Sequence, residues 1–547
     1  MASSNSYPVI HSEVNLGGPQ FRANRGAWED LLLKFERASI DSVAEGGQQY
    51  LLRHQQRGQL LARDRIALLL DPDSPFLELC PFAGWDQDDI PPCGNLISGI
   101  GSVWVIFGYS SGRPVLIISH IPTQNGGSWS KLTVPKQNRV TEIANENNLP
   151  IVALVQSAGV FLPHQFDIFH KGGQLFRDLS QRSQNGQQSC AIVFGSSTAG
   201  GAYQPAMSDY TIFVKGQAQV FLGGPPLVKM ATGEIVDAET LGGAETHARL
   251  TGLADQIAVD EFDAIRKARE WMLTLPEPLT DFSTIDAPLP PRYPPEELLS
   301  LVDPDIRKPF DMTEVLIRIV DDSRISMFKP SFGSNLITAY AQIMGHNVGI
   351  IANRIPVING DEASKGAQFI RLYNQSNLPI LFLHNVTGFM VGTKAEHSAI
   401  IKKGAQMVSA VSCSKVPHIS IILGASYGAG NYAMCGRSYK PRFMFTWPTG
   451  RCSVMGPDQL AGVMQNIEAN SAKSKGKVLD QEAVTKRTEV LKQTVLRDCD
   501  PYGTSSALHD DGVIDPRDTR HIVGMCLEVV KVPGVEGAAA HNALARL

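Results

Sequence analysis

The feature of this sequence that most constrains its fold is an internal repeat. Residues 191–203 (AIVFGSSTAGGAY) match residues 420–432 (SIILGASYGAGNY) at an offset of 229 positions. Upstream, residues 147–159 (NNLPIVALVQSAG) match residues 376–388 (SNLPILFLHNVTG) at the same offset. A repeat of this kind means that one structural unit occurs twice along the chain.

The two copies have the same order of expected elements. A short apolar run, typical of a buried strand, ends in a turn of Gly, Ser and Ala residues, and a helix is expected to start there. Residues 131–148 and 366–376 have the pattern of helices lying between the strands. Strands alternating with helices predict α/β units with parallel strands, packed in layers.

A proline-rich segment at residues 275–297 separates the copies, and its composition predicts an extended linker. A chain of 547 residues is also too long for one hydrophobic core, because single cores stop growing at roughly 250–300 residues. We therefore predict two domains, at residues 1–285 and 286–547.

Composition excludes several classes of protein. The net charge of −5, with both signs interspersed, argues against nucleic acid as a partner, and no apolar run reaches the roughly 20 residues of a membrane span. The eight cysteines include no CxxC pair, which argues against a zinc site or a disulfide framework and predicts no metal.

The two ends of the sequence bear on the compartment. The N-terminus lacks a secretory pattern, and Glu13 precedes Arg22, the first Arg, which disfavours a mitochondrial presequence. A cytoplasmic protein is expected. Ala545-Arg546-Leu547 follows the small-basic-Leu pattern of a peroxisomal address and makes that compartment the alternative.

The turn of the second copy contains Gly424-x-Ser426-x-Gly428, the nucleophile-elbow pattern of serine hydrolases. A hydrolase would also need a later His and an acid, for which the sequence offers His509, His521 and Asp458. The pattern is not kept in the first copy, where Ala199 replaces the final glycine. A hydrolase also gives no reason for the duplication.

What both copies keep is a run of small residues at the start of the expected helix, Gly200-Gly201 and Ala429-Gly430. Small side chains at a helix start expose backbone N–H groups, which can hold an oxyanion. Close packing of helix on strand also requires small residues. The repeat alone leaves both explanations open.

Six segments, in the same order along the chain, carry a resemblance to a known family: residues 65–79, 195–209, 223–247, 386–392, 427–448 and 510–519. In these segments the chain resembles the carboxyltransferase (beta) subunits of biotin-dependent acyl-CoA carboxylases. Methylcrotonoyl-CoA carboxylase is the most similar subgroup, with geranyl-CoA carboxylase close by. The resemblance implies an α/β fold of tandem duplicated ClpP/crotonase-like domains of the carboxyltransferase type.

The resemblance also implies roles for the two turns. The amides of Gly200 and Gly201 would stabilise the enolate of an acyl-CoA thioester, and those of Ala429 and Gly430 would bind the ureido oxygen of biotin. The acyl-CoA side would further include Ser157, Ala158, Gly159, Ala199, Ala202, Tyr203 and Lys229. The biotin side would include Val386, Thr387, Gly388, Phe389, Tyr427 and Gly428.

The same resemblance implies partners. The sequence has neither a biotinylation site nor an ATP-binding signature, so carboxybiotin would be carried by a separate biotin carboxylase/biotin carrier (alpha) subunit. The assembly would be a homohexamer, a trimer of dimers, with active sites between copies.

The sequence departs from the family at Gln156 and Ala158, where the family has Asp and Gly, and at Arg354, where the family is glycine-bearing. The simplest interpretation is altered acyl specificity. Two alternatives are a biotin-independent crotonase-type CoA enzyme, such as a decarboxylase or condensing enzyme, and a non-catalytic scaffold subunit.

Overall fold

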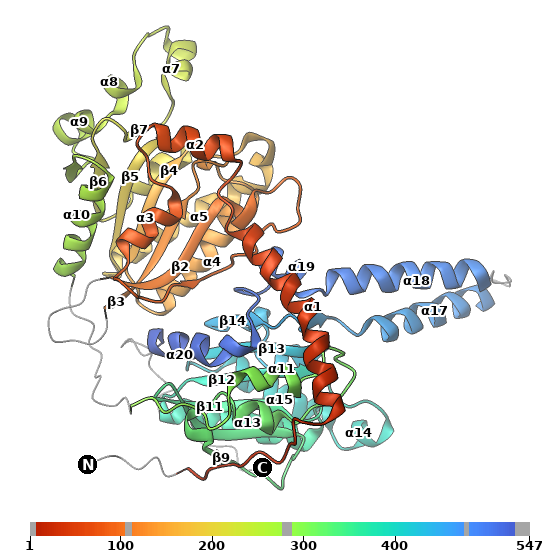
Figure 1. Cartoon of the computed structure of the whole chain (residues 1–547). Helices are drawn as coiled ribbons and strands as arrows, with labels where there is room; N and C mark the ends of the chain where they lie inside the picture. The colour runs from red at the N-terminus through yellow and green to blue at the C-terminus, as the bar shows by residue number, and fades with distance from the viewer. Residues whose placement is uncertain (1–6, 104–111, 276–286, 475–480, 531–547) are drawn as a thin grey trace.

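Each half of the chain forms one β-sheet, and residues of both sheets, together with residues of several helices, take part in one shared core (Figure 1). The computed structural model describes residues 7–103, 112–275, 287–474 and 481–530. In the first half the strands are β1 Leu77–Glu78, β2 Leu96–Val103, β3 Arg113–His120, β4 Ile151–Ser157, β5 Ser189–Thr198, β6 Tyr210–Val214, β7 Gln219–Phe221 and β8 Gln256–Ala258. In the second half they are β9 Ile325–Met327, β10 Leu336–Ile343, β11 His346–Asn353, β12 Ile380–Val386, β13 His418–Tyr427, β14 Phe443–Thr446 and β15 Arg451–Ser453.

The helices of the first half are α1 Pro19–Ser42, α2 Gln48–Gln56, α3 Ala62–Leu69, α4 Thr133–Glu146, α5 Gln165–Gln184, α6 Gly200–Ala206, α7 Pro225–Thr232, α8 Ala238–Gly242, α9 Ala244–Thr246 and α10 Glu261–Thr274. Those of the second half are α11 Leu298–Leu301, α12 Met312–Leu316, α13 Gly360–Ser376, α14 Thr393–His397, α15 Ile400–Ser412, α16 Gly428–Ala433, α17 Pro457–Ser474, α18 Gln481–Asp498, α19 Pro501–Ser506 and α20 Thr519–Val529. The predicted helices at 131–148 and 366–376 correspond to α4 and the end of α13.

The pairing of the strands repeats at the offset seen in the sequence. The parallel pair β4–β5 shifts register between Val155 and Ser157, and the parallel pair β12–β13 shifts between His384 and Val386. Both shifts lie 229 residues apart, as do the isolated bridges Trp129–Val160 and Ile358–Phe389. The duplication predicted from the sequence is therefore confirmed in the backbone.

The parallel pairing predicted from the alternation of strands and helices does not extend to the start of each sheet. Strands β2 and β3 pair antiparallel, and so do β10 and β11. The second pair is a hairpin closed by two residues, Met344 and Gly345, with φ of 52° and 79°. Positive φ at both positions is the geometry of a type I′ turn, which allows a tight antiparallel connection.

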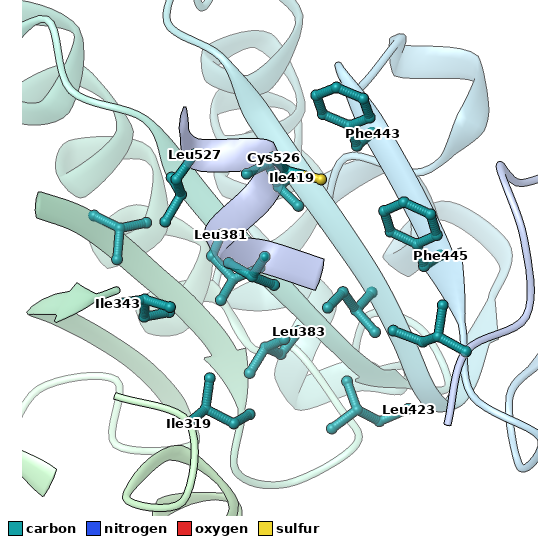
Figure 2. Close-up of a cluster of buried hydrophobic side chains, with 14 of the residues drawn as sticks. Ile319, Ile343, Leu381, Leu383, Ile419, Leu423, Phe443, Phe445, Cys526 and Leu527 are labelled. Atoms are coloured by element: carbon teal, nitrogen blue, oxygen red, sulfur yellow. The ribbon is translucent and has the colours of Figure 1, made fainter. Parts of the chain in front are cut away.

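Side chains alternate along the strands between two different cores, as the period of two requires. On β12, Leu381 and Leu383 face the core shared by the two halves, while Ile380 and Phe382 face the core under α13 and α15. Figure 2 shows Leu381 and Leu383 in the shared core, near Ile343. Because the shared core also holds residues of β2, β3 and α4, burial joins the halves into one hydrophobic interior.

The predicted domain division at 285/286 stays a prediction, and part of its linker, residues 276–286, lies outside the described residues. The N-terminal segment nevertheless contacts the second half. The indole of Trp28 on α1 is fully buried and donates a hydrogen bond to the carbonyl of Val302 (2.8 Å). The amide of Ile10 donates to the carbonyl of Ser323 (3.0 Å).

Candidate active site: two matching turns

The first turn joins β5 to α6. Ala199 connects them with φ 51° and ψ −118°, and the helix begins at Gly200. Within the described residues, the amides of Gly200 and Gly201 donate to no protein acceptor. Two neighbouring N–H groups at this helix start are therefore available to an oxygen atom of a ligand.

Glycine is needed here because the surroundings are tight. A Cβ on Gly201 would lie 3.2 Å from both the Cβ of Ser157 and the Oγ of Ser197, and one on Gly200 would lie 3.2 Å from the ring of Trp129. The hydroxyl of Ser197 donates to the carbonyl of Gly201 (2.8 Å) and ties the strand to the helix.

The loop after β4, Ser157-Ala158-Gly159, lies beside this turn, and Trp129 anchors it. The amide of Trp129 donates to the carbonyl of Gly159 (2.8 Å), and the indole Nε1 donates to Nε2 of His120 (3.1 Å). Burial lowers the pKa of His120 to about 4, so its ring is neutral at pH 7 and accepts that bond.

The remaining residues predicted for the acyl-CoA side divide into two groups. Ala202 is buried behind the turn, and Tyr203 is 43% exposed with its ring 5.2 Å from that of Phe176. Lys229 is exposed on α7, in an excursion that projects beyond the sheet (Figure 1). The structure thus brings Ser157–Gly159, Ala199 and Ala202 around the turn and leaves Lys229 outside it.

The second turn joins β13 to α16 in the same way. Gly428 occupies the position of Ala199 in the repeat and has a similar φ of 55°. Within the described part of the chain, the amides of Ala429 and Gly430 also donate to no protein acceptor. A Cβ on Gly430 would lie 2.7 Å from Cγ2 of Val386 and 3.0 Å from Cα of Gly388.

The loop after β12 supports this second turn. Both the amide and the hydroxyl of Thr387 donate to the carbonyl of Pro356 (2.6 and 2.7 Å), and Gly388 has φ of 141°. The ring of Phe389 lies against Gly404, where a Cβ on the glycine would be 3.1 Å from Cε1 of the ring. Tyr427 is 4% exposed, and burial raises its pKa to about 12, which keeps it neutral.

Ser426 is not an exposed nucleophile. It is fully buried within β13, and its hydroxyl lies 2.9 Å from Nδ1 of His384 and accepts a hydrogen bond from Nδ2 of Asn431 (2.8 Å). The histidine beside it is therefore His384, and neither His509 nor His521. A nucleophile elbow presents its serine on an exposed turn, so the hydrolase hypothesis is wrong.

The departures from the family pattern leave both turns in place. Ala158 is not among the described residues with positive φ, so its Cβ causes no backbone strain. Gln156 accepts a hydrogen bond from the buried Arg65 (3.0 Å), whose charge is paired with Glu261 (2.8 Å). Arg354 is exposed, and its amide donates to the carbonyl of Asn335.

Sequence reasoning missed the supports of the turns, Trp129 with His120 and His384 with Asn431. The signal that could have found Trp129 was the repeat itself. Trp129 and Ile358 are equivalent positions, and each pairs with the loop after a strand, at Val160 and at Phe389.

Across residues 7–103, 112–275, 287–474 and 481–530, no group of three or more His, Cys, Asp or Glu side chains is placed to hold a metal ion. In the same ranges, no helix has the length and apolarity needed to span a bilayer.

Each copy of the repeat presents two neighbouring helix-start amides, and this places the chain in the class of proteins whose backbone can hold an oxyanion. Comparison with known families gives the assignment within that class: the carboxyl transferase domain model matches residues 53–534. The chain therefore belongs to the carboxyl transferase family.

Individual relatives agree with this assignment. A probable biotin-dependent acyl-coenzyme A carboxylase beta2 subunit of Mycobacterium tuberculosis is 46% identical over 506 residues, which are 91% of this chain and 92% of the relative. A probable mitochondrial methylcrotonoyl-CoA carboxylase beta chain of Drosophila melanogaster is 42% identical, over 95% and 92% of the two chains. The crystal structure of the P. aeruginosa geranyl-CoA carboxylase beta subunit matches with a TM-score of 0.87 at 38% identity, over 97% of this chain and 99% of that chain.

The resemblance inferred from the six segments, the tandem crotonase-like fold and the carboxyltransferase activity are thus confirmed. Neither relative lends support to a peroxisomal location, and the Drosophila protein is described as mitochondrial. Residues 545–547, on which that alternative depends, lie outside the described residues.

Proposed function

We propose that this chain is the carboxyltransferase component of an acyl-CoA carboxylase that acts on a short enoyl-CoA such as 3-methylcrotonoyl-CoA. The observation that carries the proposal is the pair of matching turns, each with two backbone amides that have no acceptor among the residues that the structure describes. Carboxyl transfer to a thioester develops negative charge on one oxygen of each reactant. Two preorganised pairs of donors are what such a reaction requires.

On the thioester side, the amides of Gly200 and Gly201 would stabilise the enolate oxygen. Trp129 is 1% exposed and covers Gly200, so water is kept from this side of the turn and the electrostatic effect of the amides is strengthened. Removing one such donor typically costs about 10²–10³ in rate.

On the other side, the residues present fit the uncharged cyclic urea of biotin. The amides of Ala429 and Gly430 offer two donors to one oxygen, and Tyr427 and His384 nearby are neutral. Carboxybiotin, carried on a partner alpha subunit, would supply the carboxyl group and accept the substrate proton. The chain itself would then need no ionised general base, which agrees with the absence of a charged side chain from the described turns.

We also propose that active sites form between copies of the chain, within a hexamer built as a trimer of dimers. Apolar side chains stand exposed beside each turn: Leu162 (74%) and Phe166 (91%) near the first, Met390 (41%) and Val391 (81%) near the second. Leu162 and Val391 are equivalent in the repeat, so the two rims suit contact of one half with the other half of a second copy. Light scattering of the Val391→Glu variant should show a smaller particle than the unmodified chain.

The two alternatives rested on the departures at Gln156, Ala158 and Arg354. Both turns keep their supports, and their amides have no acceptor within the described part of the chain. These observations favour the carboxyltransferase over a biotin-independent enzyme or a scaffold. A cytoplasmic location remains a proposal.

The test is the reverse half-reaction on the isolated chain. It would be incubated with 3-methylglutaconyl-CoA and free biotin, and the decarboxylated acyl-CoA followed by mass spectrometry. Biotin-dependent turnover that is lost in Gly201→Val is expected. Turnover that needs no biotin, or none with this or any other carboxylated acyl-CoA, would contradict the proposal. Gly26→Ala is the matched control, since a Cβ at that helix position meets no atom within 4 Å.

A further inference from the structure

The serine of the Gly-x-Ser-x-Gly pattern has no part in the chemistry described so far, yet it is among the best-connected polar side chains near the second turn. Ser426 Oγ accepts from Asn431 Nδ2 at 2.8 Å and lies 2.9 Å from His384 Nδ1. These three side chains come from β13, α16 and β12, and none is more than 7% exposed. A buried cluster of this kind is costly to form unless its members satisfy one another.

The hydrogen bonds run in one direction when Nδ1 of His384 is the unprotonated ring nitrogen. Burial lowers the pKa of His384 to about 3, so the ring is neutral at any pH near 7. Asn431 donates to the serine oxygen, and the serine hydroxyl can then donate to an unprotonated Nδ1 of His384. The hydrogen bonds from Asn431 to Ser426 and from Ser426 to His384 thereby connect the first turn of α16 to two strands.

The first half has the same serine but not its partners. Ser197 is equivalent to Ser426 and is also fully buried, whereas Val155 and Ala202 stand in the places of His384 and Asn431. With no polar neighbours of that kind, Ser197 donates instead to the carbonyl of Gly201 (2.8 Å). The two turns therefore have similar backbones and different supports.

We propose that His384, Ser426 and Asn431 act as positioning residues for the amides of Ala429 and Gly430, and for the second turn alone. Asn431 directly follows Gly430, so fixing its side chain to β13 fixes the rotation of the helix start that carries both donors. This role depends on the proposed function, because the ligand it serves is the ureido oxygen of biotin.

The consequence is a selective effect on one side of the active site. Replacing Asn431 with Ala, or His384 with Val, gives the second half the residue of the first half at each position. A misplacement of donors by a fraction of an ångström should lower kcat for biotin-dependent decarboxylation by roughly 10- to 100-fold. The KM for the acyl-CoA thioester should not change, because the first turn keeps its own support.

Ser426→Ala and Ser197→Ala form a matched pair, since the two serines are equivalent and equally buried. Ser426→Ala should lower kcat in the biotin titration, and Ser197→Ala should change the parameters of the thioester. His384→Asn, which keeps a polar atom near the place of Nδ1, should restore part of the activity lost in His384→Val. Equal changes on both sides in Asn431→Ala, or no change on either, would overturn the proposal.

Hydrogen exchange gives a second readout that does not depend on turnover. In Asn431→Ala and in His384→Val, amides in residues 425–436 should exchange roughly five-fold faster, the effect of losing one hydrogen bond worth about 1 kcal/mol. Amides in residues 196–207 should exchange as before. If the unmodified chain shows no biotin-dependent turnover, the proposed function fails, but unequal exchange of the two turns would still support the positioning role. Equal exchange would refute it.

Discussion

The substitution of Gly430 by Ala is the sharpest test of the second turn, and Gly201 provides its counterpart. A Cβ at residue 430 would lie 2.7 Å from Cγ2 of Val386, 3.0 Å from Cα of Gly388 and 3.2 Å from its amide nitrogen. Two of these three contacts are with backbone atoms, which cannot rotate away. A Cβ at residue 201 would meet nothing closer than 3.2 Å, so a small local shift accommodates it.

The magnitude follows from what must move. In Gly430→Ala either the start of α16 or the loop Val386–Gly388 must shift, and the shift misaligns the amides of Ala429 and Gly430. Removing a single such donor costs about 10²–10³, so kcat of the biotin-dependent half-reaction should fall by about 10²-fold or more. The kcat of Gly201→Ala should fall by roughly 10-fold or less, since a tight contact of this kind disturbs the alignment of the Gly200 and Gly201 amides without preventing it.

Stability should change far less than activity. Ala in a helix is favoured over Gly by about 1 kcal/mol, while overpacking costs about 1–3 kcal/mol, so Gly430→Ala should be destabilised by at most about 2 kcal/mol. The assay is the decarboxylation of 3-methylglutaconyl-CoA with biotin as the varied reactant, together with urea unfolding. A wild-type kcat in Gly430→Ala, or a larger loss in Gly201→Ala than in Gly430→Ala, would refute the reasoning. Gly26→Ala should match the unmodified chain in both measurements.

Three further predictions concern stability. Ala199→Gly should raise the free energy of unfolding by about 1 kcal/mol in urea titrations, because relief of a positive φ outweighs the added freedom of the unfolded chain. Arg139→Met should lower it by roughly 1.5–3 kcal/mol, since Asp511 would lose the donor to both its oxygens (2.9 and 2.8 Å) and would keep its ion pair with Arg437 (2.9 Å); an unchanged midpoint would contradict this. Burial raises the pKa of Asp510 to about 6, above its value in the unfolded chain. As pH falls, the folded chain therefore binds this proton before the unfolded chain does, and the contribution of Asp510 to the free energy of unfolding rises between about pH 7 and pH 4. Asp510→Asn should abolish that contribution, which unfolding at pH 5 and pH 8 would measure; an unaltered pH dependence would count against it.

The units that carry the turns were predictable because their physics is local. A fully buried strand must be an apolar run, and a turn with exposed amides must have small residues, so residues 151–159, 189–201, 380–388 and 418–430 could be recognised from the sequence. The hairpin of β10 and β11 was missed because its turn is Met344-Gly345 rather than an Asn-Gly or Asp-Gly pair. No local pattern around Trp28 indicated that it would lie against Val302, since that contact depends on how the halves pack.

The supports of the two turns were beyond sequence reasoning for a different reason. Ser197 and Ser426 look alike in the repeat, and the difference between them lies in neighbours on other strands and helices. A buried hydroxyl accepts whichever partner the packing supplies, so its role is set by residues such as Val155 and His384. The repeat identifies equivalent positions, and only the tertiary structure shows that their side chains have different hydrogen-bond partners.

The residue between strand and helix shows which property of the turn is required. Gly428 adopts φ of 55° without strain, because it has no Cβ. Ala199 adopts φ of 51° with ψ of −118°, the region of the first central residue of a type II′ turn, which Gly dominates. An alanine held there costs of the order of 1–3 kcal/mol, and such strain persists where the surrounding structure determines the conformation. Since a positive φ is kept with either residue, the path of the backbone into α6 and α16 is what the two halves share, and this path leaves the amides of both helix starts without an acceptor among the described residues.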